Sequence, residues 1–156
     1  MQFLAIALML TAGAAGPRIY SEGLSVAASS ETGGTYASAM AVDGMPATRW
    51  ASADKTPMPQ WFELRFAEPV ELDTVLLHIA VDSLYAAWKD IEVSFSDGAP
   101  VMLALEADVP NPVIRFEPRT ARTVRVTVHS VHEARNYVGL FEIQAALDPD
   151  RRLEGL

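Results

Sequence analysis

The chain has 156 residues, enough for one domain, and its 50% hydrophobic and 21% charged residues are typical of a globular protein. Because it contains no cysteine, it forms neither a disulfide framework nor a thiolate metal site. The formal net charge of -8 argues against binding to nucleic acid and against adsorption to an anionic membrane, since both attract basic surfaces. Neutral ligands, cations and basic partners stay open, since acidity alone selects none of them.

The first residues differ in composition from the rest of the chain. An apolar run covers residues 3–10, and small residues follow at 12–16. The run is too short to span a bilayer and fits the apolar core of a secretory signal peptide, with Ala12-Gly13-Ala14 as the cleavage site. Since the start carries no Lys or Arg, a buried N-terminal strand or helix is the alternative. We predict a signal peptide at residues 1–16 and a secreted or periplasmic protein.

Beyond residue 20 hydrophobic and polar residues alternate, as in Val124, Val126 and Val128, which is the pattern of strands with one face in a core. Turn residues such as Asp97-Gly98 separate these segments. The pattern predicts an all-β fold, an antiparallel jelly-roll β-sandwich of about eight strands. The charged residues 148–156 are predicted to be a flexible tail. The expected strands are residues 24–28, 61–66, 74–81, 91–95, 101–106, 113–117, 123–128 and 140–145, with one helical turn at 36–40.

Four segments carry a resemblance to a known family. Residues 41–50 (AVDGMPATRW) match the pattern A-x-D-G-x-x-x-T-x-W, and PQWFEL at 59–64, VSFSDG at 93–98, and ARTVRV at 121–126 with LFEI at 140–143 follow in order. Together they resemble the discoidin domains, or coagulation factor V/VIII type C domains, of the galactose-binding-like class. Family 32 carbohydrate-binding modules share the first pattern. The resemblance implies a discoidin-type domain at residues 20–147 with a binding surface in the loops at one end.

The resemblance also implies a calcium site where the first motif meets the last strand. Carried over onto this chain, Asp43 and Glu142 supply carboxylate oxygens, Thr48 a hydroxyl and Met45 a backbone carbonyl. Such an oxygen-rich set suits Ca²⁺. Relatives often carry Asp or Asn in place of Met45, so the site depends on whether that position contributes its carbonyl or its side chain. The alternative is that Asp43 caps its turn and Glu142 pairs with an arginine.

Two predicted loops carry candidate ligand-binding residues. A sugar offers an apolar face of C–H groups and a rim of hydroxyls, so its site needs an aromatic ring and convergent polar groups. Tyr85 and Trp88 in the first loop are candidate platforms, and His132, Arg135 and Asn136 in the second are candidate polar contacts. The alternative is that Trp88 plugs the end of the sandwich and that Arg135 and Asn136 brace their own loop.

These features favour a non-catalytic, calcium-stabilised module that binds a glycan or glycoconjugate through its end loops. No thiol nucleophile, G-x-S-x-G elbow or H-E-x-x-H motif occurs, so the sequence predicts no enzyme. The first alternative is a protein–protein interaction module in which Leu84, Tyr85 and Trp88 form a hydrophobic hot spot. Two others are adsorption to a neutral lipid surface through apolar loops and a small hydrolase whose carboxylates converge in space.

Overall fold

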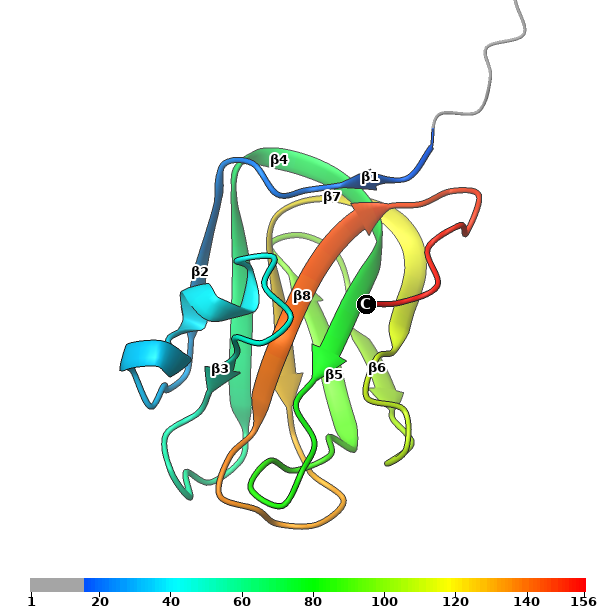
Figure 1. Cartoon of the computed structure of the whole chain (residues 1–156). Coiled ribbons are helices and arrows are strands. Elements are labelled where there is room, and N and C mark those ends of the chain that lie inside the picture. The colour runs from blue at the N-terminus through cyan, green and yellow to red at the C-terminus, as the bar shows by residue number, and fades with distance from the viewer. Residues whose placement is uncertain (1–15) are drawn as a thin grey trace, which may run out of the picture.

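The computed structural model describes residues 16–156, and these form a β-sandwich (Figure 1). Every strand pairing is antiparallel, and the hydrogen-bonded order is β1-β8-β4-β7-β5-β6, with β2 paired to β4 and β3 paired to β8. The predicted all-β fold of about eight strands is therefore confirmed. The elements are β1 (Arg18–Ile19), β2 (Leu24–Ala28), η1 (Gly34–Tyr36), η2 (Ser38–Ala41), β3 (Trp50–Ala51), β4 (Gln60–Ile79), β5 (Asp90–Phe95), β6 (Val101–Ala104), β7 (Val113–Val128) and β8 (Gly139–Leu147).

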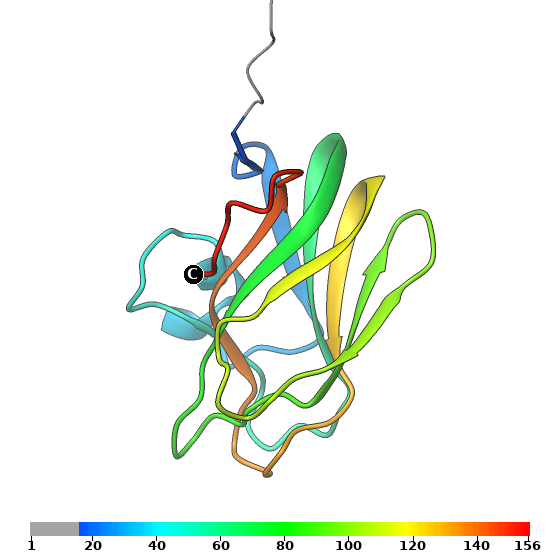
Figure 2. The same ribbon diagram turned by 90° about the vertical axis from the view of Figure 1, so that its right-hand side faces the viewer.

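Strands β4 and β7 each run through both layers of the sandwich. The first part of β4 pairs with β2 and with the second part of β7, whereas the second part of β4 pairs with β8 (Figure 2). We expected two strands in place of each. Pro69 and Pro118 lie in register shifts of the β4–β7 ladder, where a residue without an N–H bends the strand without breaking its continuation.

The core lies between the two layers and is built from the inward-facing residues of the alternating pattern. Trp50 meets Phe62 edge-on, with ring centroids 5.2 Å apart. No helix within residues 16–156 is long and apolar enough to cross a membrane. The largest fully buried side chains are Trp50, Trp88, Phe62, Leu64, Leu72, Leu76, Leu77, Ile91, Leu140, Ile143, Val75 and Val93.

The C-terminal segment, residues 148–156, which the sequence predicts to be a flexible tail, is bonded to the body of the sandwich in this structure. The Asp148 carboxylate accepts hydrogen bonds from the backbone N–H groups of Arg152 and Leu153, both at 2.9 Å. It also pairs with Arg115 at 2.8 Å, and Arg115 in turn donates to the Leu153 carbonyl at 2.6 Å. Sequence reasoning missed these contacts because Arg115 lies far away in the chain. The predicted signal peptide, apart from Gly16, lies outside the described residues.

An ion-pair cluster lies on the outer face of the larger layer. The Glu63 carboxylate accepts hydrogen bonds from Arg65 Nε at 2.6 Å and from Arg125 Nε at 2.8 Å. The Arg125 guanidinium also lies over the Trp61 ring, 3.7 Å from its centroid. Burial of Glu63 alone would raise the pKa of its carboxyl, but the hydrogen bonds and charges of the two guanidiniums outweigh burial and hold that pKa below its usual value.

This depressed pKa gives a prediction for acid stability. A carboxyl with a lower pKa in the folded state stabilises the fold above its unfolded pKa of about 4.3, and this contribution is lost as the pH falls through the folded value. We expect Glu63→Gln to lower the free energy of unfolding at pH 7 by about 1–2 kcal/mol and to flatten its dependence on pH in the acid range.

Urea unfolding at a series of pH values measures both effects. Glu68→Gln, at an exposed position in the bend of β4, is the matched control and should stay within about 0.5 kcal/mol of the wild type. Equal acid slopes for the wild type and Glu63→Gln would contradict the prediction.

Candidate ligand and metal sites

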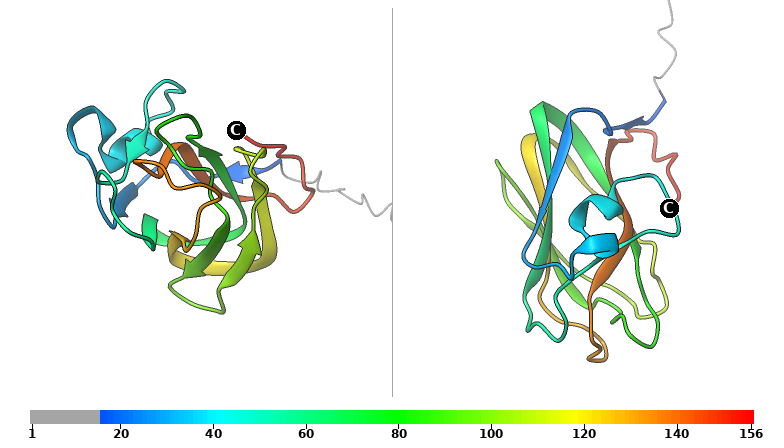
Figure 3. Two further views of the ribbon diagram at one scale, coloured as in Figure 1. Left: turned by 90° about the horizontal axis from the view of Figure 1, so that it is seen from below. Right: turned by 60° about the vertical axis from the view of Figure 1, so that its left-hand side comes forward.

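Three loops meet at one end of the sandwich: residues 52–59 before β4, 80–89 between β4 and β5, and 129–138 between β7 and β8 (Figures 1 and 3). Backbone hydrogen bonds join them. Ser52 N donates to Val138 O at 2.9 Å, Lys55 N to Asn136 O at 2.8 Å, and Ala86 N to Tyr137 O at 2.9 Å. Because each loop is tied to the next, the surface that they form is held in place before any ligand binds.

The loops enclose an open hollow of about 320 Å³. This volume lies near the lower end of the range for small-molecule sites, which is about 300–1,000 Å³. The walls combine apolar groups such as Met58 and Val131 with polar ones such as Thr56. The full lining is Ser52, Lys55, Thr56, Pro57, Met58, Ala86, Val131, Ala134, Arg135, Asn136, Tyr137 and Val138.

Two of the predicted polar contacts, Arg135 and Asn136, line this hollow. Exposed Arg135 pairs with Glu133 at 2.9 Å, and Asn136 Nδ2 donates to Asp54 Oδ1 at 2.9 Å. The amide oxygen of Asn136 accepts no hydrogen bond within residues 16–156, so it remains available as an acceptor. Arg135 and Asn136 therefore brace the loops, which agrees in part with the alternative that they brace their own loop. They also leave one donor group and one acceptor free for a ligand.

His132 is exposed but lies outside the lining of the hollow. A ring nitrogen, Nε2, is 2.8 Å from the carbonyl oxygen of Leu105, and the backbone N–H of His132 donates to Ala87 O at 3.0 Å. The first contact ties the loop of residues 129–138 to the segment after β6, and the second ties it to the loop of residues 80–89. The structure gives His132 a bracing role here.

The two predicted aromatic platforms, Tyr85 and Trp88, are buried at 4% and 1% exposure, so neither ring offers a face to a ligand in this structure. Trp88 belongs to the main hydrophobic core. Tyr85 packs beneath the Arg49 guanidinium, which lies 4.4 Å from its ring centroid. It also lies against Gly139, where an added Cβ would come within 2.8 Å of the ring. The platform role that we predicted for both residues needs this correction.

Tyr137 is the aromatic residue that lines the hollow. It is half-buried and lies beside Tyr85, with ring centroids 5.2 Å apart and an interplanar angle of 35°. Sequence reasoning did not select Tyr137, because nothing in the local pattern shows which side of the loop its ring takes. The available signal for a ligand contact was its position in the chain, directly after Arg135 and Asn136.

The candidate calcium loop, residues 43–48, closes on itself through Asp43. One carboxylate oxygen accepts Met45 N at 2.9 Å and the other accepts the Thr48 hydroxyl at 2.5 Å. The Met45 side chain is 55% exposed, whereas its carbonyl oxygen accepts the Thr48 hydroxyl at 3.0 Å. Met45 therefore presents its carbonyl to the loop interior, and its side chain takes no part there.

Glu142 of β8 faces this loop. Its Oε2 atom is buried and has no hydrogen-bond partner within residues 16–156. Burial first, and then the nearby Asp43 carboxylate, raise the pKa of Glu142 to about 7, while the backbone N–H of Gly44 acts in the opposite direction. The alternative required an arginine paired with Glu142, and the described residues contain no such pair.

The donor set at this loop fits a hard cation. Two carboxylates that face each other, one with an unpartnered buried oxygen, favour a positive charge between them. No group of three or more His, Cys, Asp or Glu side chains gathers anywhere in the described part of the chain. Any bound Ca²⁺ therefore draws its other ligands from carbonyls, the Thr48 hydroxyl and water.

Comparison with known proteins places the chain in a family. Residues 21–146 match the family described as a domain of unknown function, DUF7402. The chain belongs to this family. No curated protein sequence matches it. The chain also resembles several solved structures over 80% or more of its length.

The family 32 carbohydrate-binding module of NanJ from Clostridium perfringens, solved with galactose, has a TM-score of 0.71 at 14% identity, covering 83% of this chain and 98% of that one. Chitosan-binding module 1 from a chitosanase/glucanase of Paenibacillus sp. IK-5 has a TM-score of 0.62 at 28% identity, covering 80% and 96%. Module 2 of the same enzyme, solved with chitotriose, has a TM-score of 0.61 at 28% identity, covering 80% and 97%. The likeness confirms the sandwich fold and shows that the chain is structurally similar to carbohydrate-binding modules, whereas the discoidin assignment stays a prediction.

The two buried tryptophans give a matched pair of variants. Trp50 and Trp88 are 0% and 1% exposed, but only Trp50 Nε1 has an acceptor, Ser30 O at 3.0 Å, whereas Trp88 Nε1 has none within residues 16–156. We expect Trp88→Phe to destabilise the fold by about 1 kcal/mol less than Trp50→Phe, because it removes an unsatisfied donor rather than a made hydrogen bond. Chemical denaturation of both variants checks this, and a cost at Trp88 equal to or above that at Trp50 would contradict it.

Proposed function

We propose that this DUF7402 domain is a non-catalytic carbohydrate-binding module whose ligand occupies the hollow between the three end loops. The observation that carries the proposal is the hollow itself, where a half-buried tyrosine, an exposed arginine and an amide oxygen without a partner converge. Structural neighbours solved with galactose and with chitotriose support it. The predicted signal peptide and an exported location belong to the same proposal.

The chemistry of the hollow matches a sugar in two respects. The Tyr137 ring, together with apolar Met58 and Val131, offers a surface for the C–H face of a pyranose. Arg135 donates hydrogen bonds, and the Asn136 amide oxygen accepts one from a hydroxyl. His132 takes no part in this site, because its ring nitrogen is bonded to Leu105 O and the ring lies outside the hollow.

The first ligand class to test is a β-linked amino sugar of the chitosan type. Among the neighbours above, the two chitosan-binding modules have the higher sequence identity, 28%. Galactose-containing glycans are the second class, since the module with the TM-score of 0.71 was solved with galactose.

The alternative function, protein binding through a hydrophobic hot spot on the loop of residues 80–89, has less support from the structure than from the sequence. Two of its three members, Tyr85 and Trp88, are buried. Leu84 is 50% exposed and its near neighbour Val81 is 42% exposed, which is an ordinary surface pair rather than a central aromatic cluster.

Arg135→Ala tests the sugar site directly. We expect the affinity for the cognate oligosaccharide to fall about tenfold, because a charge-assisted hydrogen bond contributes on the order of 1.5 kcal/mol. Isothermal titration calorimetry with chitotriose, galactose and GalNAc-β-1,3-galactose gives the measurement. Arg18→Ala, which removes an exposed arginine of β1 at the other end of the sandwich, is the control and should bind as the wild type does. Unchanged affinity in Arg135→Ala, or no saturable binding of any of these sugars by folded protein, would overturn the proposal.

We further propose that the loop of residues 43–48 and Glu142 hold a structural calcium ion. Asp43 and Glu142 would give carboxylate oxygens, Thr48 its hydroxyl and Met45 its carbonyl. The ion would neutralise two carboxylates that otherwise repel each other, which supports this placement. It would also tie the segment before β3 to β8, and so stabilise the sandwich without acting on a ligand.

Calcium should therefore raise the melting temperature of the protein. At a concentration about tenfold above a millimolar-range Kd, binding to the folded state adds about 1.4 kcal/mol, or roughly 3–6 °C. Differential scanning calorimetry with calcium and with chelator measures the shift, and Glu142→Gln should abolish it. Glu154→Gln, in the exposed C-terminal segment, is the control that should retain it. Equal melting temperatures of the wild type in calcium and in chelator would refute the site.

A further inference from the structure

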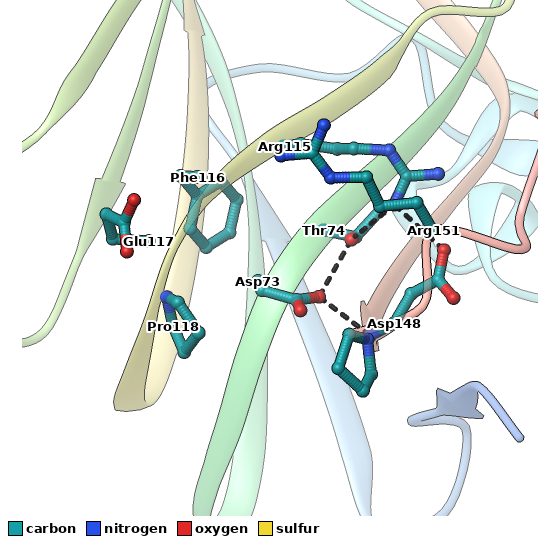
Figure 4. A pocket seen from close by; sticks show the side chains of 9 residues that line it. Asp73, Thr74, Arg115, Phe116, Glu117, Pro118, Asp148 and Arg151 are labelled. Carbon is teal, nitrogen blue, oxygen red and sulfur yellow. Dashed lines mark hydrogen bonds and ion pairs between the residues drawn. The ribbon is translucent and has the colours of Figure 1, made fainter. Parts of the chain in front are cut away.

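A second hollow, of about 340 Å³, lies where β4 and β7 bend, at the end of the sandwich away from the three loops (Figure 1). Figure 4 shows the side chains that line it. Strands β4 and β7 form one part of its wall, and the segment that follows β8 forms the other. That segment supplies Asp148, Pro149 and Arg151, which lie beyond the residues that match DUF7402. The hollow is therefore completed by residues of this chain that the family match does not include.

An irregularity in the β4–β7 ladder creates the space. Leu72 pairs with Arg119 and Thr74 with Arg115, so Asp73 alone on β4 faces three residues of β7, namely Phe116, Glu117 and Pro118. The extra residues bend β7 away from β4, and Pro118 has no N–H to restore the ladder. Bulges of this kind re-aim side chains, and here they leave Asp73 at the base of an open hollow.

The Asp73 carboxylate has an oxygen to spare. Its Oδ1 atom accepts the Thr74 hydroxyl at 2.8 Å and the Asp148 backbone N–H at 2.7 Å. Oδ2 accepts no hydrogen bond within residues 16–156, although the residue is only 8% exposed. This oxygen, in a residue that lines the hollow, can accept a hydrogen bond from a donor brought by a ligand.

The two arginines at the hollow, Arg115 and Arg151, differ in how many hydrogen bonds and ion pairs their side chains form. Arg115 donates to Asp148 Oδ2 at 2.8 Å and to Leu153 O at 2.6 Å, so it fixes the C-terminal segment in place. The Arg151 side chain is exposed and forms no ion pair within residues 16–156. Its backbone has a φ of 53°, the left-handed region that non-glycine residues rarely adopt, in a turn closed by Arg151 N donating to Asp148 O at 3.0 Å. Arg151 is thus held at the rim with its guanidinium available.

The charges around the hollow select the class of ligand. Asp73, Glu117 and Asp148 oppose an anion, while Arg115 and Arg151 oppose a cation. A neutral ligand with several hydroxyls meets neither penalty, because it donates to Asp73 Oδ2 and accepts from Arg151. Phe116 supplies an apolar wall for its C–H groups.

We propose that this hollow is a second saccharide-binding site, formed by Asp73, Phe116 and Arg151 and independent of the loop site. The choice of a sugar among neutral polyhydroxyl ligands rests on the function proposed above. The site makes the module bivalent, with one binding surface at each end of the sandwich.

An NMR titration of the ¹⁵N-labelled chain with chitotriose, and separately with galactose, tests this. We expect saturable amide shifts at residues 72–74, 115–118 and 148–151. Asp73→Asn keeps an oxygen for the Thr74 and Asp148 contacts but replaces the spare acceptor by a donor. The affinity measured from these shifts should therefore fall about tenfold. Arg151→Asn should do the same, since asparagine tolerates the left-handed backbone. Arg152→Ala removes an equal charge from a side chain that does not line the hollow, and should bind as the wild type does.

The outcomes separate the two sites. Shifts confined to the three end loops would overturn the second site and leave the proposed function standing. Shifts confined to the residues of the second hollow, unchanged in Arg135→Ala, would support the second site and overturn the loop site. Shifts at neither end of the sandwich would overturn both. Full binding at the second hollow by Asp73→Asn and Arg151→Asn would overturn the assignment of these residues, and with it the proposal.

Discussion

Pairing between β4 and β7 holds the two layers of the sandwich together, and the other strands take their places from it. Strands β4 and β7 both belong to the two layers, so the continuous backbone of each strand and the hydrogen bonds between them connect one layer to the other. β2 and β5 add to the outer edges of the ladder in one layer, and β8 adds to β4 in the other. A sandwich built in this way cannot lose the ladder without losing both layers at once.

The same ladder fixes where binding surfaces form. At one end β7 stops beside the start of β4, with Val128 opposite Gln60, and β4 stops beside the start of β8, with Ile79 opposite Leu140. The loops of residues 52–59, 80–89 and 129–138 therefore lie together at this end (Figure 1). At the other end the strands continue but fall out of register around Asp73, and a hollow opens between them. One site thus arises from strand endings and the other from a bulge, two ordinary ways for a sheet to expose polar groups without unpairing its interior.

A structural feature could be predicted from the sequence where the contacts that determine it are local in the chain. Alternation along β2, β5 and β8 predicted those strands well because each has one face in the core. Pro69 and Pro118 lie between segments that were predicted as separate strands, residues 61–66 and 74–81 and residues 113–117 and 123–128. Tertiary pairing on both sides instead carries each strand through a bend. The burial of Tyr85 was also beyond local reasoning, because it depends on the bare backbone at Gly139 and on the guanidinium of Arg49. The approach of Glu142 to Asp43 was accessible only through the family resemblance.

If both proposed sites bind sugar, their placement decides what the module can do. The two hollows lie at opposite ends of a rigid sandwich, so a short oligosaccharide cannot reach both, and a single chain gains no avidity from them unless it is long enough to fold back. Two separate glycan strands, in contrast, can each take one end. Each contact is expected to be weak, since both hollows, of about 320–340 Å³, are open and lie near the lower end of the range for small-molecule sites. Such a module would cross-link a dense polysaccharide matrix, where the effective concentration of ligand at each end is high, and release readily from soluble oligosaccharides.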